Sequence, residues 1–171
     1  MQYEADSYYH VYNRGAHSQA IFMEEENYRY LVSIMERSSE RYSTIVSAYC
    51  FMPNHYHLVL RQKQGGSIGS FLKATFNSYT QAINKRFGMS GTLFQGQAKI
   101  KHITMDSYCL RVIPYVHLNP VSAKLVSSPD EWQFSNYLEW CGIRKSILFD
   151  EELRNNYFPN PADYETYVRD Y

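Results

Sequence analysis

The sequence predicts an α+β domain in which helices pack on an antiparallel β-sheet. The first observation is the order of its predicted elements, β-α-β-β-α-β-α, which is typical of a split-βαβ arrangement. The second is that two apolar patterns with helical spacing alternate with short β-branched and aromatic runs. The chain has 171 residues and 44% hydrophobic content, which suffices for one domain with a proper core.

The first half of the chain contains three predicted strands and one helix. Residues 8–13 (YYHVYN) form the first strand. The helix covers about residues 24–41 and opens with three glutamates, which the helix dipole favours in a first turn. Residues 44–52 and 56–61 are rich in β-branched and aromatic side chains, and a Pro-Asn turn separates them. We therefore expect these two runs to pair as a hairpin.

The next two elements are a helix and a strand. A glycine-containing loop precedes Ser67, which can cap a helix that runs to residue 87. Gly88 suits the end of that helix, because glycine adopts the left-handed backbone conformation readily. Residues 92–103 alternate over their second half, which predicts another strand with Lys99 and Lys101 on one face.

The last predicted helix contains a proline. It begins near residues 104–106 and runs through Val112. Pro114 lacks a backbone N–H and restricts the residue before it, so we expect a break or kink at Ile113. Tyr115 then lies in the first turn of a restarted segment.

The C-terminal part of the chain differs in composition. From about residue 146 it is acidic and polar and contains two prolines. We therefore expect two parts: a main domain over residues 1–145 and a loosely attached extension over residues 146–171.

Other features point to a protein of the cytoplasm. The N-terminus lacks a basic start followed by an apolar stretch, and no apolar run reaches membrane-spanning length. The three cysteines, Cys50, Cys109 and Cys141, are far apart and form no CxxC motif, so we expect reduced thiols.

Charge is strongly segregated although the formal net charge is zero. Residues 1–51 hold four Lys/Arg and seven Asp/Glu, and residues 126–171 hold four and nine. Residues 52–125 hold nine Lys/Arg and one Asp, a net charge of +8. Such a block favours a polyanionic partner, because the field depends on local charge. The residues that we expect to contact nucleic-acid phosphates are Arg14, Arg61, Lys99, Lys101 and Arg111.

The run HYHLVL carries a pair of histidines with metal-ligand spacing. His55 and His57 are two residues apart on a predicted strand, so their side chains project from the same face. Two neighbouring imidazoles on a rigid strand are suited to bind a metal ion.

The run YVHLNP supplies a second group of polar side chains. On a helix, Tyr115 and Asn119 share a face and His117 points to the opposite side. If that face meets the histidine strand, two imidazoles and one amide oxygen form a metal site with open positions, and the phenol is a nucleophile. A divalent ion there could bind a phosphodiester oxygen.

These motifs resemble those of a known family. HYHLVL resembles the HUH motif of single-tyrosine HUH transposases, and YVHLNPVSAKL resembles their tyrosine helix. GTLFQGQAKIK and WQFSNY are similar to the branch called REP-associated tyrosine transposases. The resemblance covers roughly residues 7–140, and the motifs occur in the family's order.

The resemblance implies a ferredoxin-like antiparallel sheet flanked by helices, the HUH nuclease fold. It also implies cleavage and transfer of single-stranded DNA beside a hairpin, through a covalent 5′-phosphotyrosine link. Carried over, Tyr115 is the nucleophile, and His55, His57 and Asn119 hold Mg²⁺ or Mn²⁺. We expect a monomer without membrane association that acts at the bacterial nucleoid.

Two alternatives remain open at this stage. One is a DNA-hairpin-binding module that has lost its chemistry, suggested by Pro114 and by Gln97 where the family often has arginine. The other is a zinc hydrolase that uses the histidine pair with His102 or His117 as a third ligand.

Overall fold

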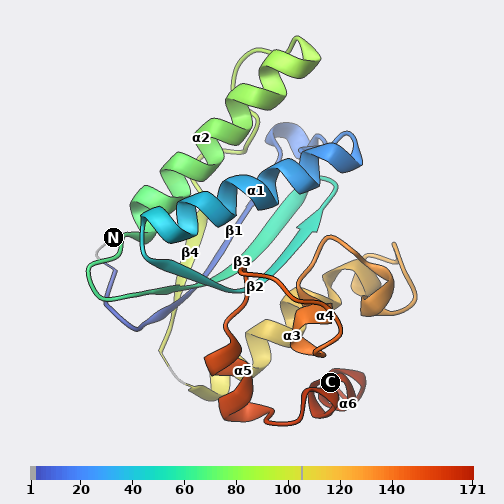
Figure 1. The fold of residues 1–171 in the computed structure, drawn as a ribbon. Coiled ribbons are helices and arrows are strands. Elements are labelled where there is room, and N and C mark those ends of the chain that lie inside the picture. The colour runs from blue at the N-terminus through green and yellow to red at the C-terminus, as the bar shows by residue number, and fades with distance from the viewer. Residues whose placement is uncertain (1–2, 105) are drawn as a thin grey trace.

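The computed structural model describes residues 3–104 and 106–171, and its centre is a four-stranded sheet. All neighbouring strands are antiparallel, in the order β2-β3-β1-β4 (Figure 1). The strands are β1 (Tyr8–Arg14), β2 (Thr44–Met52), β3 (His55–Gln62) and β4 (Lys99–Ile103). The predicted α+β fold with an antiparallel sheet is confirmed, and so is the β2–β3 hairpin.

Two long helices cover one face of the sheet (Figure 1). They are α1 (Glu25–Arg41) and α2 (Ile68–Phe87), with the bounds that their apolar spacing and caps predict. The Ser67 hydroxyl accepts a hydrogen bond from the Ser70 N–H (3.1 Å), and Gly88 ends α2 with φ +62°. Strand alternation directs Tyr9, Val11 and Leu58 into the core that the helices bury.

The opposite face is covered by α3 (Asp106–Ser122) and the C-terminal helices. The C-terminal helices are α4 (Tyr137–Trp140), α5 (Glu151–Tyr157) and α6 (Pro161–Arg169). The chain also contains two short 3-10 helices, η1 (Ala16–Ser18) and η2 (Pro129–Glu131). A second core forms here, in which Val59 of β3, Val112 and Val116 of α3, and Trp140 are buried. The helix that carries the predicted nucleophile is therefore fixed on the face that lacks α1 and α2.

Of the break or kink expected at Ile113, the break is wrong, because α3 continues from Asp106 to Ser122 through Pro114. A proline inside a helix leaves the carbonyl four residues earlier without its usual partner. That carbonyl belongs to Leu110, and it accepts a hydrogen bond from the Tyr167 hydroxyl of α6 at 3.2 Å. The Tyr171 hydroxyl reaches the next carbonyl, that of Arg111, at 3.1 Å. The tail thus supplies hydrogen bonds beside the proline.

Residues 146–171 are packed against the rest of the chain and not loosely attached as expected. Leu148, Leu153, Tyr164 and Val168 are all buried, the last three in the second core. The buried apolar positions of this segment are separated by acidic and polar residues. Its average composition is therefore polar although one side of its helices is buried.

A buried polar network ties α3 to α6. The Asn136 side-chain oxygen accepts from the Tyr49 N–H (2.8 Å), and it lies 2.9 Å from His117 Nε2. An amide oxygen only accepts, so His117 Nε2 carries the proton and Nδ1 accepts from the Tyr164 hydroxyl at 2.6 Å. Burial lowers the pKa of His117 to about 4, consistent with a neutral ring.

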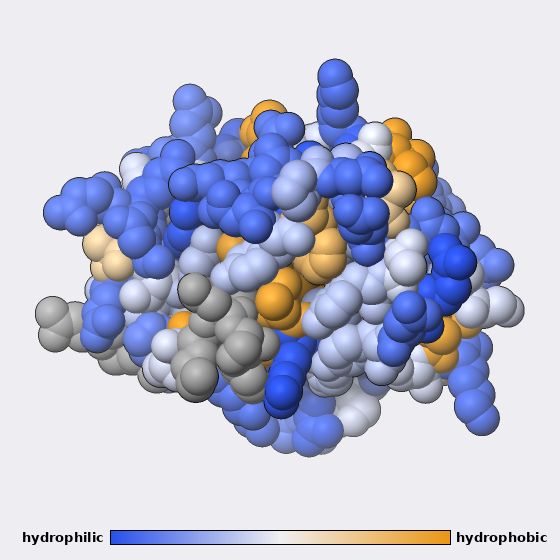
Figure 2. Space-filling view, turned by 90° about the horizontal axis from the view of Figure 1, so that it is seen from below, coloured by the Kyte–Doolittle hydropathy of each residue, from blue (hydrophilic) through white to orange (hydrophobic). Residues whose placement is uncertain are grey.

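Among the described residues, no helix combines the length and apolar character needed to cross a membrane. Figure 2 views the molecule from below, from the side of α5 and α6, where the surface is mostly hydrophilic with separate hydrophobic patches. Cys50 and Cys141 are buried free thiols, and Cys109 lies outside the side chains that the structure describes.

Tyr164→Phe tests the buried network. The variant leaves His117 Nδ1 buried without its donor, so we expect the free energy of unfolding to fall by about 1–3 kcal/mol. Tyr171→Phe is the matched control, since that hydroxyl is on a side chain 56% exposed, and we expect a loss below about 0.5 kcal/mol. Urea unfolding measures both, and equal losses would contradict the role given to the network.

Candidate active site

Strand register gathers histidines and aromatic side chains on the face that α3 covers. In the β1–β3 pair, Tyr12 lies opposite His57 and Arg14 lies opposite His55. Side chains of directly opposed residues project from the same face, and so do those two residues apart. His10 is two residues before Tyr12, so it joins this face as well.

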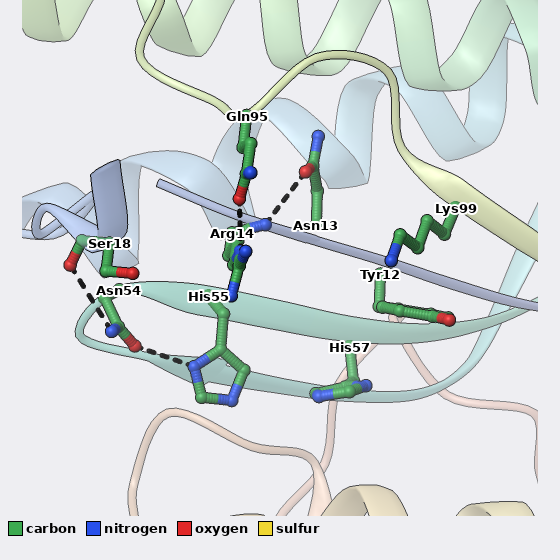
Figure 3. Close-up of a pocket in the computed structure, with 9 residues that line it drawn as sticks. All are labelled: Tyr12, Asn13, Arg14, Ser18, Asn54, His55, His57, Gln95 and Lys99. Atoms are coloured by element: carbon green, nitrogen blue, oxygen red, sulfur yellow. Dashed lines mark hydrogen bonds between the residues drawn. The ribbon is translucent and has the colours of Figure 1, made fainter. Parts of the chain in front are cut away.

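The two predicted metal ligands lie side by side on β3. The rings of His55 and His57 are perpendicular, with their centroids 5.4 Å apart. His55 Nδ1 lies 2.8 Å from the Asn54 side-chain oxygen, and His57 Nδ1 lies 3.0 Å from His10 Nε2. Figure 3 shows both rings projecting from the same side of the strand. In both of these contacts the histidine nitrogen is Nδ1.

The structure brings Tyr115 and Asn119 to these histidines. The Tyr115 ring meets the His57 ring edge-on at a centroid distance of 5.5 Å, and the His10 ring at 6.1 Å. The Tyr115 side chain is nevertheless 48% exposed, so it is open to a large substrate. The Asn119 amide nitrogen donates to the Tyr115 carbonyl at 2.7 Å, and its side chain lies beside His55.

The pKa values of all three imidazoles on this face, those of His10, His55 and His57, are lowered. Burial, with a smaller contribution from neighbouring His10 and His55, lowers the pKa of His57 to about 3. Burial and then the charge of Lys101 lower the pKa of His10 to about 4. Burial also lowers the pKa of His55, while the hydrogen bond with Asn119 acts in the opposite direction. The rings are therefore neutral at neutral pH, the form that binds metal ions.

The donor set fits a divalent cation with open coordination positions. Among the side chains that the structure describes, those of residues 3–104 and 110–171, no group of three or more His, Cys, Asp or Glu is placed to hold a metal ion. The donors that fit are the imidazoles of His55 and His57 and the Asn119 amide oxygen, whose amide nitrogen already has a partner. Two nitrogens and one neutral oxygen leave room for phosphate oxygens.

A pocket of about 520 Å³ opens beside the histidines (Figure 3). The ammonium groups of Lys99 and Lys101 lie 5.9 and 5.8 Å from the centre of the Tyr12 ring. Arg14 lies between Gln95 and His55 in the view, and its guanidinium donates to the Gln95 side-chain oxygen. Of the five predicted phosphate contacts, Arg14 and Lys99 line the pocket, and Lys101 lies near Tyr12, which lines it as well.

The other two basic residues lie elsewhere. Arg111 is exposed on α3, one turn before Tyr115 and on the same side of the helix. Arg61 is on β3 but is paired with Asp150 (3.3 Å) and Glu152 (2.9 Å) of the C-terminal extension, and its side chain is only 14% exposed. Because Arg61 is already paired with these two carboxylates, we do not propose it as a phosphate contact.

Neither proposed third histidine reaches the pair. His102 is on the other face of β4, where its ring stacks on Tyr9 at 4.8 Å. His117 is fully buried in the network with Tyr164. The residue that sequence reasoning missed is His10, 47 positions before His57. Its alternation with Tyr12 was the available signal, but only the pairing of β1 with β3 shows that it contacts His57.

Comparison with known proteins identifies the family. The family model described as "Transposase IS200 like" matches residues 4–122, most of the chain. The chain therefore belongs to the IS200-like transposases, a family of DNA-processing enzymes. No curated protein matches the chain.

Solved structures share the fold. A REP-associated tyrosine transposase bound to a REP hairpin superposes with a TM-score of 0.70 and 15% identity, over 90% of each chain. A putative transposase from Deinococcus radiodurans R1 gives a TM-score of 0.48 and 16% identity, over 68% of this chain and 92% of that one. The first likeness confirms the predicted sheet flanked by helices as the fold of a tyrosine transposase.

Proposed function

We propose that this protein cleaves and rejoins single-stranded DNA beside a hairpin, as a member of the REP-associated branch. The observation that carries the proposal is the position of Tyr115, whose ring lies against His57 while Asn119 lies beside His55. Family membership and the fold shared with a hairpin-bound transposase support it.

Tyr115 is the nucleophile in this proposal. Its Oη attacks a phosphodiester, an Oη–P bond forms, and the bond from phosphorus to the 3′ oxygen breaks. The phenol loses its proton and the departing oxygen gains one, which leaves a 5′-phosphotyrosine and a free 3′-hydroxyl. The new ester keeps the energy of the phosphodiester bond, so attack by a 3′-hydroxyl rejoins the strand without a nucleotide cofactor.

His55, His57 and Asn119 would hold the cation, Mg²⁺ or Mn²⁺. When bound, such an ion withdraws charge from the scissile phosphate and helps to orient it. Imidazole ligands suit Mn²⁺ at least as well as Mg²⁺. The His57 and His10 rings also lie roughly perpendicular to the Tyr115 ring, and this packing would restrict its rotation and keep the hydroxyl near the proposed phosphate position.

Lys99, Lys101 and Arg14 would contact the DNA backbone beside the pocket, and Arg111 beside the nucleophile. Residues 1–145 form the catalytic part in this proposal, and residues 146–171 support α3. We further propose that the protein acts as a monomer in the bacterial cytoplasm, at the nucleoid, because its substrate is DNA.

A hairpin-binding module without chemistry is the alternative. Pro114, where a break or kink of the helix is expected, and Gln97, where the family often has arginine, favour it. Since α3 continues through Pro114 and Tyr115 lies against His57, we favour the cleaving enzyme.

Tyr115→Phe tests the nucleophile. With a single-stranded hairpin substrate and Mn²⁺, we expect the covalent protein–DNA adduct to fall at least about 1,000-fold, because the attacking oxygen is absent. Denaturing gels and mass spectrometry detect the adduct, and hairpin affinity should be unchanged. Tyr30→Phe is the control: Tyr30 is 39% exposed on α1, which covers the opposite face of the sheet, and this variant should keep full adduct formation. An adduct that persists without the Tyr115 hydroxyl refutes the assignment.

The salt dependence of DNA binding tests the basic residues. Each contact with single-stranded DNA contributes about −0.7 to the slope of log K against log salt, so four contacts give about −2.8. Lys101→Gln should reduce the magnitude of the slope by about 0.7. Arg61→Gln removes the same charge but should leave the slope unchanged, because Arg61 is paired with Asp150. If the slope changes more in the Arg61 variant than in the Lys101 variant, the assignment of Lys101, and not Arg61, to phosphate contact is contradicted.

A further inference from the structure

His10 is a hydrogen-bond partner of His57 outside the proposed metal site. Its Nε2 lies 3.0 Å from His57 Nδ1, and the two rings are stacked with centroids 5.2 Å apart. Both side chains are only 6% exposed, so water cannot easily replace either partner. His10 has no place in the motifs that define the candidate site.

The contact determines which nitrogen of His57 is available to a metal ion. A neutral imidazole has one N–H and one lone pair. If His57 Nδ1 accepted from His10, the His57 proton would be on Nε2 and no lone pair would face the site. If His57 Nδ1 donates to His10, Nε2 is bare and can bind a metal ion.

The other proposed ligand has the same arrangement. His55 Nδ1 lies 2.8 Å from the Asn54 side-chain oxygen, and the Asn54 amide nitrogen is directed to the Ser18 carbonyl (3.5 Å). The oxygen can only accept, so His55 carries its proton on Nδ1 and its Nε2 is bare. Figure 3 shows the Ser18–Asn54–His55 chain of contacts. His10 occupies the equivalent position for His57.

We propose that His10 is a positioning residue, which accepts a hydrogen bond from His57 Nδ1 and thereby presents the Nε2 lone pair of His57 to the metal ion. This inference rests on the proposed function, because it assumes that His57 binds a metal ion there. The Tyr115 ring also lies roughly perpendicular to the His10 ring, with the centroids 6.1 Å apart, so the same side chain helps to fix the nucleophile. His10 itself is not a ligand, since its Nε2 is engaged by His57.

The protonation pattern can be measured on the unmodified protein. A long-range ¹H–¹⁵N correlation spectrum of the metal-free full chain distinguishes protonated from bare imidazole nitrogens, and His57→Gln assigns the His57 signals. We expect His57 to be protonated on Nδ1. A His57 ring protonated on Nε2 would overturn the proposal, and this test needs no variant of His10.

Variants test the consequence for metal binding. We expect His10→Phe, which keeps a planar ring without an acceptor, to weaken Mn²⁺ binding by about 10–100-fold, measured by electron paramagnetic resonance of free Mn²⁺. His10→Gln can place an acceptor near the same position and should recover most of the loss. His102→Phe, on the opposite face of the same sheet, is the matched control and should bind Mn²⁺ like the parent.

The outcomes separate the inference from the proposed function. A parent protein without Mn²⁺ affinity contradicts the proposed metal-dependent function itself. Equal affinities of the parent and His10→Phe contradict only the role of His10. Loss of affinity in His10→Phe with recovery in His10→Gln, together with Nδ1 protonation of His57, supports both.

Discussion

The candidate site depends on the packing of α3 against one face of the sheet. Val112 and Val116 are buried in the second core beside Val59 of β3, which fixes the rotation of the helix. Helical geometry then directs Tyr115 and Asn119, four residues apart, toward the histidines. The C-terminal extension maintains this packing, because α6 supplies a partner for the carbonyl beside Pro114 and for the buried His117.

Strand register is the second requirement. His55 and His57 share a face because they are two apart, but the surroundings of that face come from other strands. β1 contributes His10 and Tyr12, and the edge strand β4 contributes the lysines. A slip of β1 by one residue would turn His10 and Tyr12 into the apolar core under α1 and α2. The same pairing therefore determines the fold and the polarity of the site.

Local patterns predicted the strands, α1, α2 and the histidine pair, because alternation, helical spacing and caps depend on neighbouring residues. Three features could not be predicted this way. The Leu110 carbonyl, which Pro114 leaves without a helical partner, accepts a hydrogen bond from Tyr167, and the contact between His10 and His57 depends on strand pairing. Arg61 was expected to meet DNA, but the folded tail places Asp150 beside it. Each depends on partners more than 40 residues away in the sequence.

The central claim is that a cation held by the histidine pair lies next to the Tyr115 hydroxyl. Anomalous diffraction from a crystal soaked in Mn²⁺ tests it most directly. We expect one strong peak within coordination distance of Nε2 of both His55 and His57, with the Asn119 oxygen and the Tyr115 side chain facing it. A peak elsewhere, or ordered Mn²⁺ bound only through Nδ1 of either histidine, would contradict the account.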